Sequence, residues 1–131
     1  MNEEQTALAR RAVACKGFRW MPGMRTNSKF ARVVAVDSGT GAPCASEEGA
    51  TNDDCHAVWL DGVPLLPDLS DAATLGCLLA LVRKAWGQEP TGFIVPTHAG
   101  GWSYYTTLIA ADWYPGDTEA EALVAALEAA P

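Results

Sequence analysis

Four cysteines and two histidines are the residues of this 131-residue chain that could bind a metal or act as nucleophile and base. Cys44, Cys55 and His56 flank one segment, and thiolate and imidazole are ligands that zinc prefers. The spacing disfavours zinc, because ten residues separate the two cysteines, no C-x₂-C pair occurs, and an adjacent Cys and His rarely bind one ion. We predict no metal and no cofactor, and Cys44, Cys55 and His56 remain the alternative set for a metal-binding protein or a small Cys/His-dependent enzyme. A Cys44–Cys55 disulfide is a further alternative in an oxidising compartment.

The remaining candidates for catalysis lack partners that the sequence can identify. Cys15 and Cys77 lie on the apolar faces of predicted helices, where a cysteine usually serves as a small buried hydrophobic residue. His98 lies beside a predicted turn, and nothing in the sequence brings it to a thiol. There is no G-x-S-x-G elbow and no glycine-rich loop with Walker or Rossmann spacing. We therefore predict a protein that is not an enzyme.

Aromatic residues gather in the last third of the chain and suggest an interface. Trp102, Tyr104 and Tyr105 come within four positions, and Trp113 with Tyr114 follows. Aromatic side chains are enriched at protein interfaces and can also stack on nucleobases. Stacking on bases normally needs a basic groove, and this part of the chain is acidic. We predict that Trp102, Tyr104 and Tyr105 contact a protein partner, and nucleic acid is disfavoured.

The formal net charge of −7 is unevenly distributed along the chain. Residues 1–40 hold seven basic and three acidic residues, a balance of +4, whereas residues 41–131 hold two basic and thirteen acidic residues, a balance of −11. Such an asymmetry indicates either a binding face or pairing between the two parts on folding, and we favour pairing. The basic strip over residues 10–32 leaves nucleic-acid binding as a weaker alternative.

Segment 37–55 concentrates five acids in a sequence rich in Gly, Ala, Ser and Asp, without a periodic apolar pattern. We predict a long flexible loop, and loops of this length within a domain are usually functional or disordered. Four acids of the loop are predicted to contact a basic partner surface: Glu47, Glu48, Asp53 and Asp54.

Hydrophobic periodicity predicts seven elements in the order α-β-β-α-β-β-α. The helices are predicted over residues 3–16, 71–86 and 119–130, and the strands over 30–36, 56–60, 93–98 and 102–110. This order predicts an α+β fold in a single domain, 1–131, with one antiparallel sheet of about four strands, built from two hairpins and packed by three helices.

Local signals mark the ends of these elements and one tight turn. Asn2 with Gln5, and Thr118 with Glu121, have the spacing of capping boxes. The other predicted signals are an N-cap at Ser70, glycine terminators at Gly17 and Gly87, and a type II turn at Pro22-Gly23.

The composition sets the broad class of the protein. With 49% hydrophobic and 19% charged residues, it is unlike a disordered chain. No apolar stretch approaches the ~20 residues that span a bilayer, and the charged N-terminus is unlike a signal peptide. We expect a soluble, cytoplasmic protein that does not enter a membrane.

Three segments carry a resemblance to a family of small proteins from tailed phages and prophages. They are ARRAVACKGFRWMPGMR (residues 9–25), LPDLSDAATLGCLLALVRKAWG (66–87) and TEAEALVAALEAAP (118–131). The last is also similar to the C-terminal helix of phage α-β-α sandwich domains. The resemblance implies a phage origin and a similar fold, for proteins of unknown function, and it carries no catalytic residues. Segment 37–55 is longer than is typical of this family.

Together these features predict a small phage or prophage accessory protein that binds another protein without catalysis. The expected partner is a host or phage protein with a basic surface, and inhibition of a host defence system is one role open to such a module. A second copy of the chain is a further expected partner.

Overall fold

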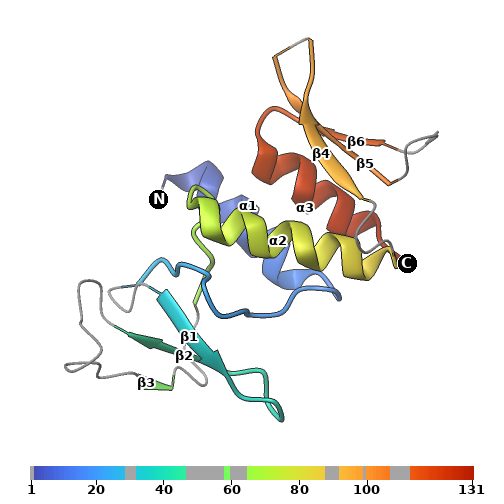
Figure 1. Ribbon diagram of the computed structural model, residues 1–131. Helices are drawn as coiled ribbons and strands as arrows, with labels where there is room; N and C mark the ends of the chain where they lie inside the picture. The colour runs from blue at the N-terminus through green and yellow to red at the C-terminus, as the bar shows by residue number, and fades with distance from the viewer. Residues whose placement is uncertain are drawn as a thin grey trace. The chain divides into compact units, whose positions relative to one another are not determined.

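The computed structural model describes residues 2–28, 32–46, 58–59, 65–87, 92–98, 100–106 and 113–131. Three helices alternate with two groups of three strands (Figure 1). The helices are α1 (Glu3–Ala14), α2 (Ala72–Ala85) and α3 (Glu119–Ala129). The strands are β1 (Arg32–Val36), β2 (Pro43–Ser46), β3 (Val58–Trp59), β4 (Phe93–Pro96), β5 (Trp102–Tyr105) and β6 (Trp113–Gly116).

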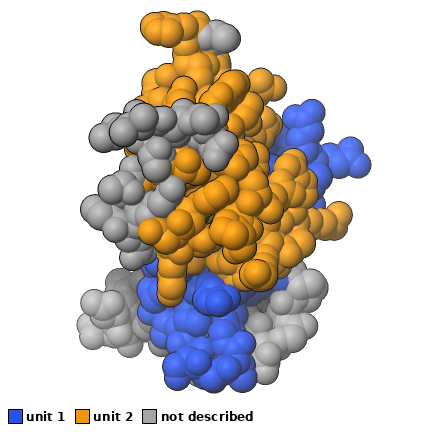
Figure 2. Space-filling model, turned by 90° about the vertical axis from the view of Figure 1, so that its right-hand side faces the viewer, with its two compact units in different colours: residues 1–9, 19–77 blue, residues 10–18, 78–131 orange. Residues whose placement is uncertain are grey.

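The chain forms two compact units, which are coloured separately in Figure 2. Unit 1 comprises residues 1–9 and 19–77 and contains the sheet β1-β2-β3. Unit 2 comprises residues 10–18 and 78–131 and contains the sheet β4-β5-β6 together with α3. The boundaries fall within α1 and within α2, so each of these helices supplies residues to both units.

Unit 1 is built on antiparallel strand pairing, with β2 between β1 and β3. The register of β1 on β2 shifts between Val33 and Ala35, which marks a bulge. Ala45 of β2 packs with Leu65, and Trp20 covers this small cluster. The predicted turn at Pro22-Gly23 is confirmed, since Gly23 has φ +100° and the Met24 N–H donates to the Met21 carbonyl at 3.1 Å.

Unit 2 packs α3 across one face of the sheet β4-β5-β6 (Figure 1). The buried residues of the helix are mostly small, which allows close approach: Ala120, Ala122, Leu123, Val124, Ala126 and Leu127. Gly116 of β6 is the closest point, because a Cβ there would overlap the backbone of Ala122. The narrow apolar stripe of α3 therefore packs against a strand that carries no side chain at position 116.

The predicted α+β class and the three predicted helices are confirmed, but the prediction of one four-stranded sheet is corrected. The strands form two separate three-stranded sheets. The additional strands β2 and β6 were missed because β2 lies in the Gly/Ala/Ser-rich segment and β6 contains Pro115 and Gly116, residue types depleted in strands. Segment 37–55, predicted as a loop, thus contains a strand at Pro43–Ser46, and residues 47–55 lie outside the described part.

The predicted cap of α2 is also corrected. The carboxylate of Asp71 accepts from the Thr74 N–H at 2.9 Å, which is the N-cap bond. Ser70, one residue earlier, donates its hydroxyl to Asp68 instead. Both residue types cap helices well, so local sequence could not decide between them.

Two other predicted caps are confirmed, because in each the side chain of the N-cap residue accepts the expected backbone hydrogen bond. At α1, the Gln5 N–H donates to the Asn2 side chain at 2.8 Å and the Asn2 N–H donates back to Gln5 at 3.0 Å. At α3, the Glu121 N–H donates to the Thr118 hydroxyl at 3.1 Å, while the Glu121 carboxylate accepts from Asp117. The reciprocal bond of this second box is therefore displaced by one residue.

Gly17 is needed for a reason other than the one that the sequence suggested. It is absent from the glycines with positive φ, unlike the predicted terminator Gly87 with φ +66°. A Cβ on Gly17 would lie 3.1 Å from Leu127 Cδ1 and 3.3 Å from Ala85 Cβ. The position therefore needs glycine for close packing within unit 2.

Candidate functional site

The face of the sheet β4-β5-β6 that points away from α3 carries a continuous set of apolar side chains. Side chains alternate along a strand, and Tyr104, which is fully buried, marks the face that packs on α3. The register then assigns six residues to the opposite face: Phe93, Val95, Ser103, Tyr105, Trp113 and Pro115. All except Ser103 are apolar or aromatic, so this outward face resembles an unpartnered interface.

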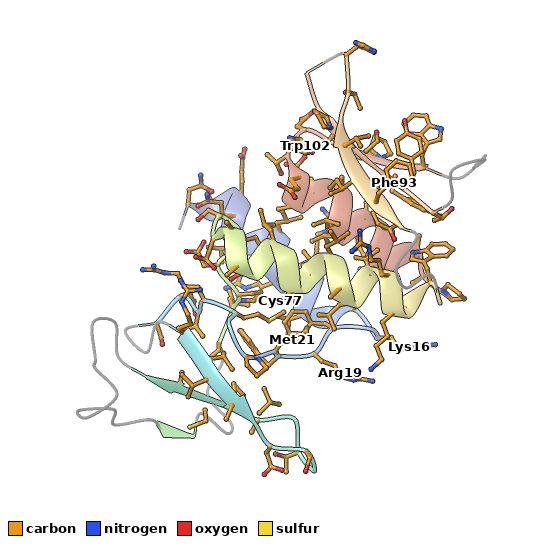
Figure 3. The ribbon with its side chains drawn as sticks, in the orientation of Figure 1. Lys16, Arg19, Met21, Cys77, Phe93 and Trp102 are labelled. Atoms are coloured by element: carbon orange, nitrogen blue, oxygen red, sulfur yellow. The ribbon has the colours of Figure 1, made fainter. Side chains whose placement is uncertain are left out.

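Aromatic rings form a row across this outward face. Phe93 and Tyr105 are directly paired, and their rings stack with centroids 5.4 Å apart at 16°. Figure 3 labels Phe93 on β4 and Trp102 on the neighbouring strand β5; Trp102 is paired with Gly116, which packs on α3, so Trp102 belongs to the opposite face. Trp113 is paired with Tyr105 from the other side, and 53% of Trp113 is exposed. The row therefore ends in a ring that another molecule can contact.

A groove of about 600 Å³ lies beside this row. Its outward side chains are those of Tyr105, Trp113 and Pro115, with Ser103 between them. Thr97, Gly101 and Asp117 complete the lining, together with Trp102 and Gly116, whose position in the register belongs to the α3 side of the sheet. The volume falls within the usual range of ligand-binding sites.

The indole N–H groups distinguish the tryptophans of the groove from a structural one. Trp86 donates its indole N–H to the Ala126 carbonyl at 2.9 Å, and its ring lies 5.6 Å from that of Tyr114. Within the described ranges, the indole N–H groups of Trp102 and Trp113 donate to no protein acceptor. Trp113 lies on the outward face, so the groove offers its indole N–H as a hydrogen-bond donor, whereas Trp102 belongs to the other face.

Asp117 gives the lining of the groove a negative charge. It is exposed, and its backbone N–H donates to the Glu121 carboxylate at 2.9 Å. In the part of the chain that the structure describes, the Asp117 carboxylate has no hydrogen bond and no ion pair. It is free to accept from a cationic group of a ligand.

Tyr104, predicted to contact a partner, is instead a core residue. Its side chain is fully buried, and its hydroxyl meets no hydrogen-bond partner among the described residues. Burial raises the pKa of the Tyr104 hydroxyl, and the positive charge of Arg83 partly opposes this. Trp102 and Tyr105 are both half-buried, and Tyr105 lies on the outward face while Trp102 lies on the α3 side; their contact with a partner stays a prediction.

Several basic residues of the first 40 positions form ion pairs. Three pairs join this basic segment to acids of the rest of the chain: Arg11–Glu128, Arg25–Asp68 and Arg32–Asp71. The Arg32 guanidinium lowers the pKa of the Asp71 carboxyl to about 2, helped by bonds from Thr74. Part of the basic charge of the first 40 residues is thus paired with acids of the rest of the chain in the folded protein, which supports the pairing interpretation.

The cysteines that the structure describes lack the features of reactive thiols. Cys44 is buried in β2, while Cys15 and Cys77 are half-buried. Burial is the main cause that raises the pKa of both Cys15 and Cys77, which lowers their thiolate fraction. No cluster of three or more His, Cys, Asp or Glu residues within the described ranges could hold a metal ion.

Six residues of the predicted sites fall outside the described part of the chain. They are the acids Glu47, Glu48, Asp53 and Asp54, and the alternative metal or catalytic residues Cys55 and His56. Their predicted roles remain predictions. No helix within the described ranges is long and apolar enough to cross a membrane.

The sequence did not reveal which aromatic residues face outward. Trp113, Pro115 and Asp117 line the groove, but only Trp113 was noticed, as part of an aromatic cluster. The alternation of Trp113 and Pro115 around the inward Tyr114 is the signal that could have found them. Comparison with protein-family models, with curated proteins and with solved structures gave no match.

Proposed function

We propose that this protein is a non-enzymatic binding module, and that its partner-binding surface is the outward face of β4-β5-β6. The observation that carries the proposal is Trp113, which is 53% exposed and lines a groove together with Tyr105 and Pro115. Tryptophan and tyrosine dominate the binding energy of protein interfaces when a partner removes them from water. An exposed tryptophan beside the half-buried Tyr105 has the arrangement of such a centre.

The electrostatics favour a partner with a basic surface. The exposed charged side chain of the groove is Asp117, and the chain as a whole has a formal charge of −7. Complementary charge speeds the encounter and selects among partners. The predicted acidic contacts at Glu47, Glu48, Asp53 and Asp54 would add to the same preference.

The resemblance to tailed-phage and prophage proteins directs the proposal to a host or phage protein as the partner. Inhibition of a host defence system is then one role that a small module of this kind could serve. A second copy of the chain is the alternative occupant of the same face.

Affinity capture with matched variants tests the proposal. The wild-type protein, Trp113→Ala, Tyr105→Ala and the control Val34→Ala would each be immobilised and exposed to the same host lysate. Val34 is a suitable control, because it is also apolar and 45% exposed but lies on β1. We expect a protein that wild type and Val34→Ala retain and that Trp113→Ala and Tyr105→Ala lose.

Retention of the same proteins by all four forms would contradict the proposal. Circular dichroism of each variant establishes that the fold is retained. A change in sedimentation coefficient with concentration, abolished by Trp113→Ala, would identify a second copy as the occupant.

A further inference from the structure

We propose that the groove on the outward face of β4-β5-β6 recognises an extended, proline-rich segment that carries an arginine or lysine. This inference rests on the proposed function and specifies its partner. The groove has a hydrogen-bond donor, apolar walls and a charged lining residue, and it lies on a sheet whose edge strands contain prolines.

The hydrogen-bonding groups of the groove match such a segment. A polyproline II helix forms no internal hydrogen bonds, so its carbonyl groups are free acceptors, and proline supplies no N–H donor. Trp113 contributes an indole N–H donor that has no acceptor in the described part of the chain. The groove therefore supplies an N–H donor to the carbonyl groups of a ligand that offers mainly acceptors.

The walls of the groove match the apolar surface of the segment. The flat rings of Tyr105 and Trp113, with Pro115 of β6, provide surfaces on which pyrrolidine rings can pack. Aromatic-lined grooves are the common recognition surface for proline-rich segments, which lose little conformational entropy on binding. A polar ligand such as a sugar fits less well, because Ser103 is buried and the Thr97 hydroxyl accepts from the Gly101 N–H.

The edges of the sheet disfavour a partner that adds a strand. Both edge strands contain a proline, Pro96 on β4 and Pro115 on β6, and proline lacks the N–H that a pairing strand would need. An extended peptide therefore gains more by lying on the face than by extending the sheet.

Asp117 supplies direction and selectivity. Asp117 belongs to the lining of the groove, and its carboxylate is free in the described ranges. A basic residue that flanks the prolines can pair with it, which fixes the direction of a segment that is otherwise nearly symmetric. An acidic residue at the same place would be repelled.

Fluorescence anisotropy with synthetic peptides tests this inference. The probe is a labelled ten-residue peptide of prolines and two leucines that ends in arginine, and the controls replace its prolines by alanine or its arginine by glutamate. We expect saturable binding of the first peptide at micromolar to sub-millimolar concentration, with affinity at least about tenfold weaker for both controls.

Variants of the protein locate the binding. Trp113→Ala should weaken binding by at least about tenfold, as for a central aromatic contact, and Val34→Ala should leave it unchanged. Asp117→Asn should weaken binding of the arginine peptide and should reduce the difference between the arginine and glutamate peptides. Equal binding of the alanine peptide, or unchanged binding by Trp113→Ala, would overturn the inference.

Competition separates this inference from the proposed function. If a captured partner depends on Trp113 but the proline peptide neither binds nor displaces it, the proline-rich assignment is wrong and the proposed surface stands. If the partner is retained by Trp113→Ala, both the proposed binding surface and the proline-rich assignment are wrong.

Discussion

The two units differ in how far certain polar side chains are hydrogen-bonded within the fold. Around the start of α2 in unit 1, charged and hydroxyl groups are joined in one network centred on Asp71. On the sheet of unit 2, the Tyr104 hydroxyl on the α3 side and the Trp113 indole N–H on the outward face have no partner among the described residues. The polar groups around α2 thus hold the fold of unit 1, while the outward face of the second sheet keeps the Trp113 donor available for another molecule.

The network of unit 1 is built from short, directional contacts. Asp71 accepts from the Thr74 N–H and hydroxyl, both at 2.9 Å, and from Arg32 at 3.0 and 3.1 Å. Thr74 in turn accepts from the Arg25 N–H at 2.8 Å, and Arg32 donates to the Gly23 carbonyl at 2.7 Å. These bonds tie the first turn of α2 to the segment that precedes β1 and to β1 itself.

The largest effect on stability is expected from a substitution that breaks this network. Asp71→Ala removes the N-cap of α2 and the carboxylate partner of Arg32, and we expect the free energy of unfolding to fall by about 2 kcal/mol or more. Urea denaturation measures the change. Asp117→Ala is the matched control, because it removes an exposed carboxylate without a partner and should cost less than ~0.5 kcal/mol. Equal effects of the two variants would refute the contrast between the units.

The next effect concerns the inner face of the second sheet. Gly92→Ala places a Cβ against the Tyr104 hydroxyl, and we expect destabilisation of about 1–3 kcal/mol by overpacking. Combining it with Tyr104→Phe should recover part of the loss, since the nearest clashing atom is removed.

Gly76→Ala is the control for this pair. A Cβ at Gly76, in the middle of α2, would meet no atom within 4 Å, so this change should stabilise by about 0.5–1 kcal/mol. Thermal denaturation compares the three variants. A harmless Gly92→Ala would show that Tyr104 is not confined as the structure describes.

The pH dependence of stability should follow Asp71. Its pKa is about 2 in the folded protein against 3.8 ordinarily, so the unfolded chain takes up the proton first as the pH falls. The stabilisation is complete above about pH 5 and is lost as the pH falls through 3.8 towards 2. We expect a loss of about 1–2 kcal/mol, reduced from the full shift because Arg32 is partly exposed.

Unfolding in urea at several pH values between 6 and 2.5 measures this loss. Trp113→Ala should show the same pH dependence as wild type, whereas Asp71→Asn should lack this part of it. If the free energy of unfolding of Asp71→Asn depended on pH as that of wild type does, Asp71 would not be the cause of the pH dependence.

The smallest expected effect is at the buried hydroxyl of unit 2. Tyr104→Phe removes a polar group that has no partner in the described ranges, so stability should be unchanged or rise by up to about 1 kcal/mol. Calorimetric unfolding resolves a change of this size. A loss above about 1 kcal/mol would mean that the hydroxyl has a stabilising partner.

Local features of the fold were predictable from the sequence, and features set by long-range pairing were not. The apolar periodicity of α2 and the capping residues Asn2 and Thr118 act within a few positions. The choice of Asp71 as the cap depends on Arg32, and the need for glycine at position 17 depends on Leu127. Neither distant neighbour is visible in the local pattern.

The candidate site was predicted only in part for the same reason. The aromatic composition around Trp102 and Tyr105 was evident, but the side of the sheet that each ring occupies depends on where α3 packs. Tyr104 is one position from each of Ser103 and Tyr105, and strand alternation sends it into the core. A shift of one residue in the predicted strands would exchange the two sets.

Site-specific photo-crosslinking tests the binding surface most directly. A photoreactive phenylalanine analogue would replace Trp113 in one form of the protein and Val34 in another, and each form would be irradiated with the captured partner. The exposed positions are similar in accessibility, so the two forms differ mainly in which sheet they probe. A crosslink from position 113 and none from position 34 is the predicted result. A crosslink from position 34 alone would contradict the assignment of the binding surface to β4-β5-β6.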